Sequence, residues 1–369
     1  GILFTDGERI LCREPGFVLL EDEGLTSGRA AWASASLEPS RIQNRYRSDL
    51  RAEPLVDSRF RHLTAADIVS KQLEELWTRV SRPGDRLALA VPGYMGTENL
   101  GLLLGVAMEL DIPVVAMVDA AVAATRRHYV NAVPVHVDLG LHSAMLTRLS
   151  QDGQVQFERS AVVDASGMLS LYDVWLRLIA ETFVQQSRFD PLHTAETEQV
   201  LQDSILDWLQ IAASKDSVSM NVVYRGISHD AEIESLQFVS AAEPVYRNIA
   251  SNLRALIRGG ETPAIQLSDR AARMPGLAET LKARVGGEVF LLEPGATARG
   301  LAARCPETRS GNAVTLVRHL PWDQSPVHVE VDHDHEGARP THVLLGNNAT
   351  PIGSSMLVMG THPDAGERW

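Results

Sequence analysis

The order of apolar and polar positions predicts alternating strands and helices over the first third of the chain. Residues 64–80 repeat apolar side chains at helical spacing after Thr64, a residue type that caps helices. Two predicted strands with apolar centres, 85–92 and 112–119, flank a helical stretch at 97–111. Apolar strands separated by a helix are typical of a parallel sheet that is covered on both faces.

The pattern changes after residue 134. The stretch "VHVDLGLHSAMLTRL" (135–149) predicts a strand, a tight turn at Asp138–Gly140 and a second strand, and a third strand follows the turn at Asp152-Gly153. Beyond this hairpin the pattern predicts helices at roughly 170–187, 194–213 and 243–258, strands near 217–225 and 231–239, a strand at 263–268, and helices at 275–285 and 296–305. The fold class is therefore α/β.

The last fifty residues differ from the rest because prolines interrupt short β-like runs. They predict a small β appendage over 321–369. Within it, "VEVDHDHEG" places His333 and His335 on one face of a strand, where they could bind a metal, and an exposed polar turn is the alternative.

The formal net charge of −13 argues against a nucleic-acid partner and against attachment to anionic lipid. No run of eighteen apolar residues occurs, so we expect no membrane span. Cys12 and Cys305 are the only cysteines and form no CxxC motif, which favours thiols in a reducing cytoplasm.

Several segments, in matching order and spacing, carry a resemblance to a known family. Residues 88–125 resemble "VPAYF…A…AGL…NEPTAAA", residues 137–149 fall where "FDLGGGTFDVSLL" stands, and residues 265–303 are similar to "VGGSSRIPKVQELL…NPDEAVAYGAA". A further segment, 25–50, looks like "VGDAAKNQ…NP…FDAKRL". The chain thus resembles, over about residues 2–310, the nucleotide-binding domain of heat-shock chaperones of the DnaK type, in the actin-like ATPase superfamily.

The resemblance implies a two-lobed actin-like fold, in which duplicated mixed sheets are flanked by helices and a nucleotide is clamped between the lobes. The implied parts are lobe I at 1–134, lobe II at 135–295 with a helical insert at about 165–258, a return helix to lobe I at 296–320, and the appendage at 321–369. The family's first phosphate-binding strand does not occur in the chain, so it either precedes Gly1 or has been lost. About 60 residues follow position 310, too few for the chaperones' peptide-binding domain.

ATP and Mg²⁺ are the cofactors that the resemblance implies, and it assigns catalytic positions to Asp119, Asp138 and Ser143. Asp138 matches the aspartate that holds Mg²⁺-bound water, a role that suits a carboxylate. Gly140 and Ser143 keep the loop's glycine and hydroxyl, and Asp119 stands where a glutamate orients the attacking water. The alternatives are that Asp138 is a turn residue and that Asp119 caps the following helix.

Further positions match the family's nucleotide contacts. Lys215 and Ser219 coincide with adenosine-contacting residues on the insert helix, although Lys215 could equally be an exposed lysine. Arg273 is retained, and Arg47 (or Arg45) falls near an essential lysine.

Other positions depart from the family. Leu141 and His142 replace one glycine pair, Asp269 and Arg270 replace another, and Gly295 replaces an aspartate. Side chains at these glycine positions should crowd the phosphates and the adenosine.

These departures favour a chaperone-like scaffold or adaptor with weak or no ATPase activity. The alternatives are an active Mg-ATP-dependent ATPase that regulates a partner protein, and a filament-forming actin-like protein. The sequence identifies neither the protein partner nor the oligomeric state.

Overall fold

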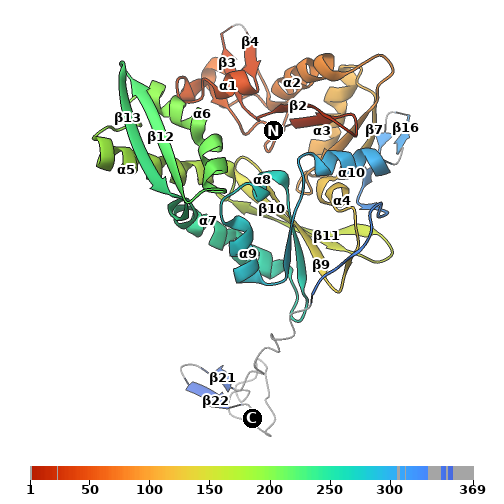
Figure 1. The fold of residues 1–369 in the computed structure, drawn as a ribbon. Coiled ribbons are helices and arrows are strands. Elements are labelled where there is room, and N and C mark those ends of the chain that lie inside the picture. The colour runs from red at the N-terminus through yellow and green to blue at the C-terminus, as the bar shows by residue number, and fades with distance from the viewer. Residues whose placement is uncertain are drawn as a thin grey trace. The chain divides into compact units, whose positions relative to one another are not determined.

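The computed structural model describes residues 2–22, 24–305, 308–311 and 313–330, and the backbone of strands at 342–345 and 348–351. The chain divides into two compact units, Gly1–Val329 and Glu330–Trp369. The first is an α/β unit with mixed sheets flanked by helices, as the sequence predicts (Figure 1). His333 and His335 lie outside the described residues.

The N-terminal part of the first unit combines short strands with two long helices. Its elements are β1 (Ile2–Thr5), β2 (Ile10–Glu14), β3 (Val18–Glu21), β4 (Gly24–Ser27), α1 (Arg29–Trp32), β5 (Ile42–Gln43), two short 3₁₀ turns (Pro39–Arg41 and Ser58–Phe60), α2 (Ala65–Val80), β6 (Leu87–Val91), α3 (Thr97–Glu109), β7 (Val114–Asp119), α4 (Ala120–Ala124) and β8 (Tyr129–Val130). Thr64 and Asp67 form the capping box of α2. Strands β6 and β7 are parallel, as the apolar runs predict.

A six-stranded sheet forms the centre of the C-terminal part, in the order β15-β14-β9-β10-β11-β19. Its strands are β9 (Val133–Leu139), β10 (Ser143–Ser150), β11 (Val155–Asp164), β14 (Pro263–Leu267), β15 (Glu288–Leu291) and β19 (His319–Leu320). Strands β9, β10 and β11 are an antiparallel meander, whereas β14 runs parallel to β9 and β15 runs parallel to β14.

Helices pack around this sheet, and α4 contacts β10 and β11. The helices of the C-terminal part are α5 (Met168–Ser187), α6 (Ala195–Ala212), α7 (Ser235–Leu256), α8 (Asp269–Ala272) and α9 (Leu277–Val285), while α10 (Ala296–Arg304) packs on α4. Val135, Val137 and Leu139 of β9 point into the core beneath α5 and α7. Side chains alternate along a strand, so His136 and Asp138 point to the opposite face. That face is therefore where a polar site can form.

The end of the first unit runs as extended chain along three different strands. Leu316–Val317 (β18) pairs with β7, β19 pairs with β11, and Val327–His328 (β20) pairs with β8. A short hairpin of β16 (Arg309–Ser310) and β17 (Ala313–Val314) precedes them. We expected an appendage from residue 321, but the compact first unit extends to Val329 because β20 joins it. In the second unit, β21 (His342–Leu345) pairs with β22 (Asn348–Pro351).

Candidate functional site

The turn between β9 and β10 is held by the start of α5. The Gly140 N–H donates to the Ser143 carbonyl at 2.9 Å. The N–H groups of Met168 and Leu169 donate to the carbonyls of Gly140 and Leu141, each at 2.9 Å. Unbonded N–H groups at a helix N-terminus are a common anion site. Here two of these donors are already bonded to the turn.

Leu141 anchors the turn in an apolar cluster from the N-terminal part. Phe17, Leu19 and Ala31 form its buried centre, and Leu141, Leu169 and other partly buried side chains pack against it. A leucine at a position where the family has glycine therefore fills space between the two parts of the unit. The turn is held by packing rather than left open to a ligand.

His142 makes the second link from this turn to the N-terminal part. Its Nε2 lies 3.3 Å from the carbonyl oxygen of Asn44. Burial lowers the pKa of His142, and the nearby Arg45 lowers it further. The imidazole is therefore neutral at physiological pH and contributes a hydrogen bond rather than a charge.

Asp138 lies in an ion pair with Arg270. The guanidinium Nη2 is 2.6 Å from Asp138 Oδ2, and the carboxylate side chain is 24% exposed. Burial acts to raise the pKa of Asp138, but the neighbouring Arg270 and His136 and hydrogen bonds from Ser268 and Arg270 together outweigh it, and the pKa falls to about 2. The carboxylate that the resemblance assigns to Mg²⁺ already has a cation as its partner.

Two buried polar atoms on this face of the sheet have no hydrogen-bond partner among the described residues: Asp138 Oδ1 and His136 Nε2. Burial lowers the pKa of His136, so the ring is neutral. The alternation of the strand puts both side chains on one face, a signal that "VHVD" carries and that our sequence analysis did not use.

Arg47 lies in the same neighbourhood. Its guanidinium donates to Gln72 Oε1 and stacks over the Tyr46 ring at 5.4 Å. Burial lowers the pKa of Arg47, and Arg270 is among the charges that lower it further. Asp138 and Arg47 thus both interact electrostatically with Arg270.

Asp119 caps α4, which was the alternative to its catalytic role. Its Oδ1 accepts the N–H groups of Ala121 at 2.9 Å and Val122 at 3.2 Å, and the residue is 1% exposed. Burial raises its pKa. The capping role is thus observed in the structure, and the catalytic role stays a prediction.

Asp269 joins the N-terminal hairpin to α8. Its carboxylate lies 2.6 Å from Arg13 on β2 and 2.5 Å from Arg273. Both arginines are therefore paired with protein rather than with a ligand. Sequence reasoning identified Asp269 and Arg270 as obstructions but missed their partners, which are distant in the chain.

Lys215 and Ser219 lie elsewhere than expected. The helix α6 ends at Ala212, so neither residue is on the insert helix, and that expectation is wrong. Lys215 lies in the turn after α6, and Ser219 lies on the exposed face of β12 (Ser217–Tyr224). The chain leaves the helix there because β12 must pair with β13 (Ile227–Glu234).

The Asp138–Arg270 pair predicts how stability depends on acid. A depressed carboxylate pKa adds stability above about pH 4, and that stability is lost as the pH falls towards 2. Asp138→Asn should flatten this acid limb, removing about 2 kcal/mol of its pH dependence. Urea unfolding at pH 2.5 to 6 measures it, with Asp152→Asn on an exposed turn as the control. Parallel acid limbs for wild type and Asp138→Asn would contradict the ion pair.

Two broader observations bear on the chain. Within the described residues there is no cluster of three or more His, Cys, Asp or Glu side chains placed to hold a metal ion. Among the helices that the structure describes, none has the length and apolar character needed to cross a membrane.

No protein-family model matches the sequence, and a comparison with curated proteins gives no match.

Proposed function

We propose that the chain is a chaperone-like protein with an actin-like ATPase fold, in which the protein's own side chains close the nucleotide site. It acts as a scaffold or adaptor rather than as an ATPase. The observation that carries the proposal is the Arg270 guanidinium, 2.6 Å from the carboxylate that would otherwise hold magnesium-bound water.

The strand order supports the proposed fold. An antiparallel meander followed by two parallel strands, in the order β11-β10-β9-β14-β15, is the arrangement expected of one lobe of an actin-like protein. The parallel pair β6 and β7, with α3 between them, is consistent with part of the other lobe. Each part has its own large hydrophobic core, as two lobes would require.

The residues present do not fit Mg-ATP. Mg²⁺ binds through carboxylates that are free to hold its water shell, and Asp138 is paired with a guanidinium. The glycine-rich loop that would approach a phosphate instead carries Leu141, which packs on an apolar cluster. We therefore assign no hydrolytic step to these residues.

Nucleotide turnover and binding by the purified chain test the proposal together. With millimolar Mg-ATP we expect no phosphate release above the uncatalysed rate and no rise in melting temperature. A ligand at 100 times its dissociation constant would stabilise the protein by about 2.7 kcal/mol, which a melting curve resolves readily. Phosphate release above the uncatalysed rate would instead establish the active ATPase. A rise in light scattering on addition of ATP would favour a filament.

A further inference from the structure

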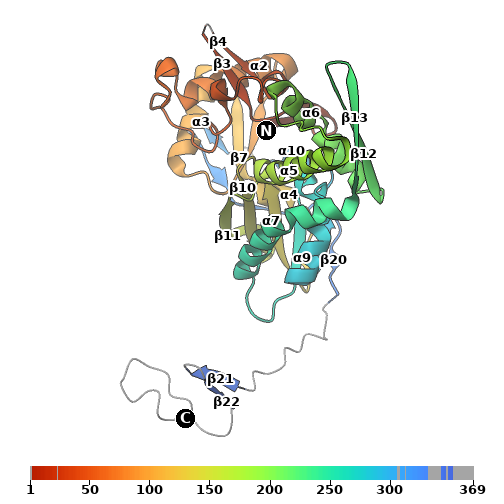
Figure 2. The ribbon, with the colours of Figure 1, turned by 90° about the vertical axis from the view of Figure 1, so that its left-hand side faces the viewer.

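The hairpin of β12 and β13 is a two-stranded sheet at the margin of the first unit, visible in both views (Figures 1 and 2). A two-residue turn joins the strands, with Arg225 at φ 51° and Gly226 at φ 80°, the left-handed conformations of a type I′ turn. Its inner face, which includes Val218, Met220 and Val222, packs into the core over α5 and α6. The hairpin is therefore rigidly supported from one side.

The outer edge of β13 is closed by a side chain. The amide group of Gln186 on α5 donates to the Glu232 carbonyl at 2.8 Å and accepts the Glu232 N–H at 2.8 Å. A primary amide that pairs in this way imitates a neighbouring strand. The edge of β13 is thus protected against pairing with another chain.

The position of Glu232 fixes which groups of β12 point outward. Because both backbone groups of Glu232 face away from β12, Glu232 and its register partner Ser219 form a non-hydrogen-bonded pair. Alternation along the strand then turns the N–H and C=O groups of four β12 residues outward: Ser217, Ser219, Asn221 and Val223. Among the described residues, none of these backbone groups has a hydrogen-bond partner.

This edge has none of the features that usually prevent strand addition. Proteins protect edges with proline, lysine, bulges or covering chain. The outward residues of β12 carry no charge and no proline, the register is unbroken, and Ser219, Asn221 and Val223 are exposed. Val223 is 60% exposed. The β13 edge of the hairpin is therefore occupied by the Gln186 amide, and the β12 edge remains available for strand pairing.

The exposed face beside the open edge is acidic. Asp230 and Glu232 of β13 lean towards β12: Asn221 Nδ2 donates to Asp230 Oδ1 at 2.8 Å, and Ser217 Oγ donates to Glu232 Oε1 at 2.6 Å. A strip of exposed β12 side chains, those of Ser219, Asn221 and Val223, lies between these carboxylates and the edge. A lysine or arginine on an added strand, about 10 Å from β13, can reach across this strip.

We propose that the open edge of β12 binds an extended segment of a partner protein that carries basic side chains at alternate positions. Main-chain hydrogen bonds to the outward groups of β12 supply affinity, and the carboxylates of Asp230 and Glu232 select for charge. A second copy of the chain is a poorer occupant, because pairing β12 with itself would join two acidic faces. The proposal does not depend on the state of the nucleotide site.

A fluorescein-labelled peptide of sequence KVKTKVKT, with its glutamate counterpart EVETEVET, tests this by fluorescence anisotropy on the full chain. The lysine peptide should bind and the glutamate peptide should not. Asn221→Pro removes one outward N–H without touching the hairpin ladder, and it should weaken binding about tenfold. Asn221→Thr keeps that N–H and serves as the matched control.

The charge contribution has its own variant. Asp230→Asn combined with Glu232→Gln should weaken binding of the lysine peptide about fivefold and reduce its salt dependence. Melting curves verify that each variant is folded. Equal affinity of wild type and folded Asn221→Pro would overturn the proposal, as would binding of both peptides alike. If sedimentation shows a dimer and Asn221→Pro abolishes it, the open edge binds a second copy of the chain, and the proposed partner protein is wrong.

Discussion

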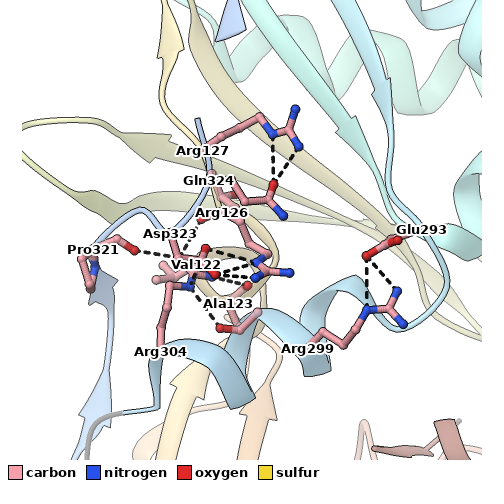
Figure 3. Close-up of polar contacts among 12 residues, drawn as sticks. Val122, Ala123, Arg126, Arg127, Glu293, Arg299, Arg304, Pro321, Asp323 and Gln324 are labelled. Carbon is pink, nitrogen blue, oxygen red and sulfur yellow. Dashed lines mark hydrogen bonds and ion pairs between the residues drawn. The ribbon is translucent and has the colours of Figure 1, made fainter. Parts of the chain in front are cut away.

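Replacing Arg304 with alanine is expected to lower the free energy of unfolding by about 3–5 kcal/mol. The side chain is 3% exposed, and its guanidinium lies where the C-terminus of α4 meets α10 (Figure 3). It donates to five carbonyl oxygens, those of Val122, Ala123, Thr125, Gly300 and Pro321, at 2.5–3.4 Å.

The cost is large because five carbonyl oxygens lose a hydrogen-bond donor at once. The last carbonyl oxygens of a helix accept no hydrogen bond from the helix itself. In α4, Arg304 donates to two of them, those of Val122 and Ala123. Asp323, 3.5 Å from Arg304, also belongs to the segment that runs to β20. Burial lowers the pKa of Arg304 to about 10, so the charge is retained at neutral pH.

Arg299 on the same helix is the matched control. It is paired with the exposed Glu293 at 2.9 Å, so Arg299→Ala should cost less than about 1 kcal/mol. Urea unfolding of both variants gives the comparison. Similar midpoints for the two would show that Arg304 does not stabilise this junction.

Gly167→Ala should destabilise the protein by about 3 kcal/mol through overpacking. The backbone of Gly167 has φ −90°, which any residue adopts, so the requirement is for space. A Cβ there would lie 2.5–2.6 Å from backbone atoms of Leu141, His142 and Ser143. The turn would have to move away from the start of α5, which would break the hydrogen bonds that Met168 and Leu169 donate to it.

Gly101→Ala separates this effect from a general effect of removing glycine. Gly101 is inside α3, where an added Cβ meets nothing within 4 Å, and alanine favours helix. We expect Gly101→Ala to be neutral or stabilising in thermal unfolding. If Gly167→Ala unfolds at the wild-type temperature, the turn is not held against α5 as described.

Local sequence patterns predict much of the fold. The helix expected at 194–213 is α6, Ala195–Ala212, because a capping threonine and apolar spacing define it. The helix expected at 243–258 begins eight residues earlier, at Ser235, where Glu234 and Gln237 form a capping box. Pro244 therefore lies in the interior of α7 rather than near its start.

The site was less predictable, because its contacts join distant residues. The sequence places Arg270 where a glycine would admit nucleotide, but its pairing with Asp138, 132 positions away, depends on β14 lying beside β9. The role of Leu141 likewise depends on the position of Phe17. By contrast, the capping role of Asp119 is local and was foreseen as an alternative.

Calorimetric titration of the full chain with Mg-ATP tests the central claim most directly. If Arg270 and Leu141 close the site, the titration shows no saturable heat at millimolar nucleotide, and the melting temperature stays unchanged. A saturable isotherm that requires Mg²⁺ and is lost in Asp138→Asn would contradict the account, because Asp138 would then bind magnesium rather than Arg270.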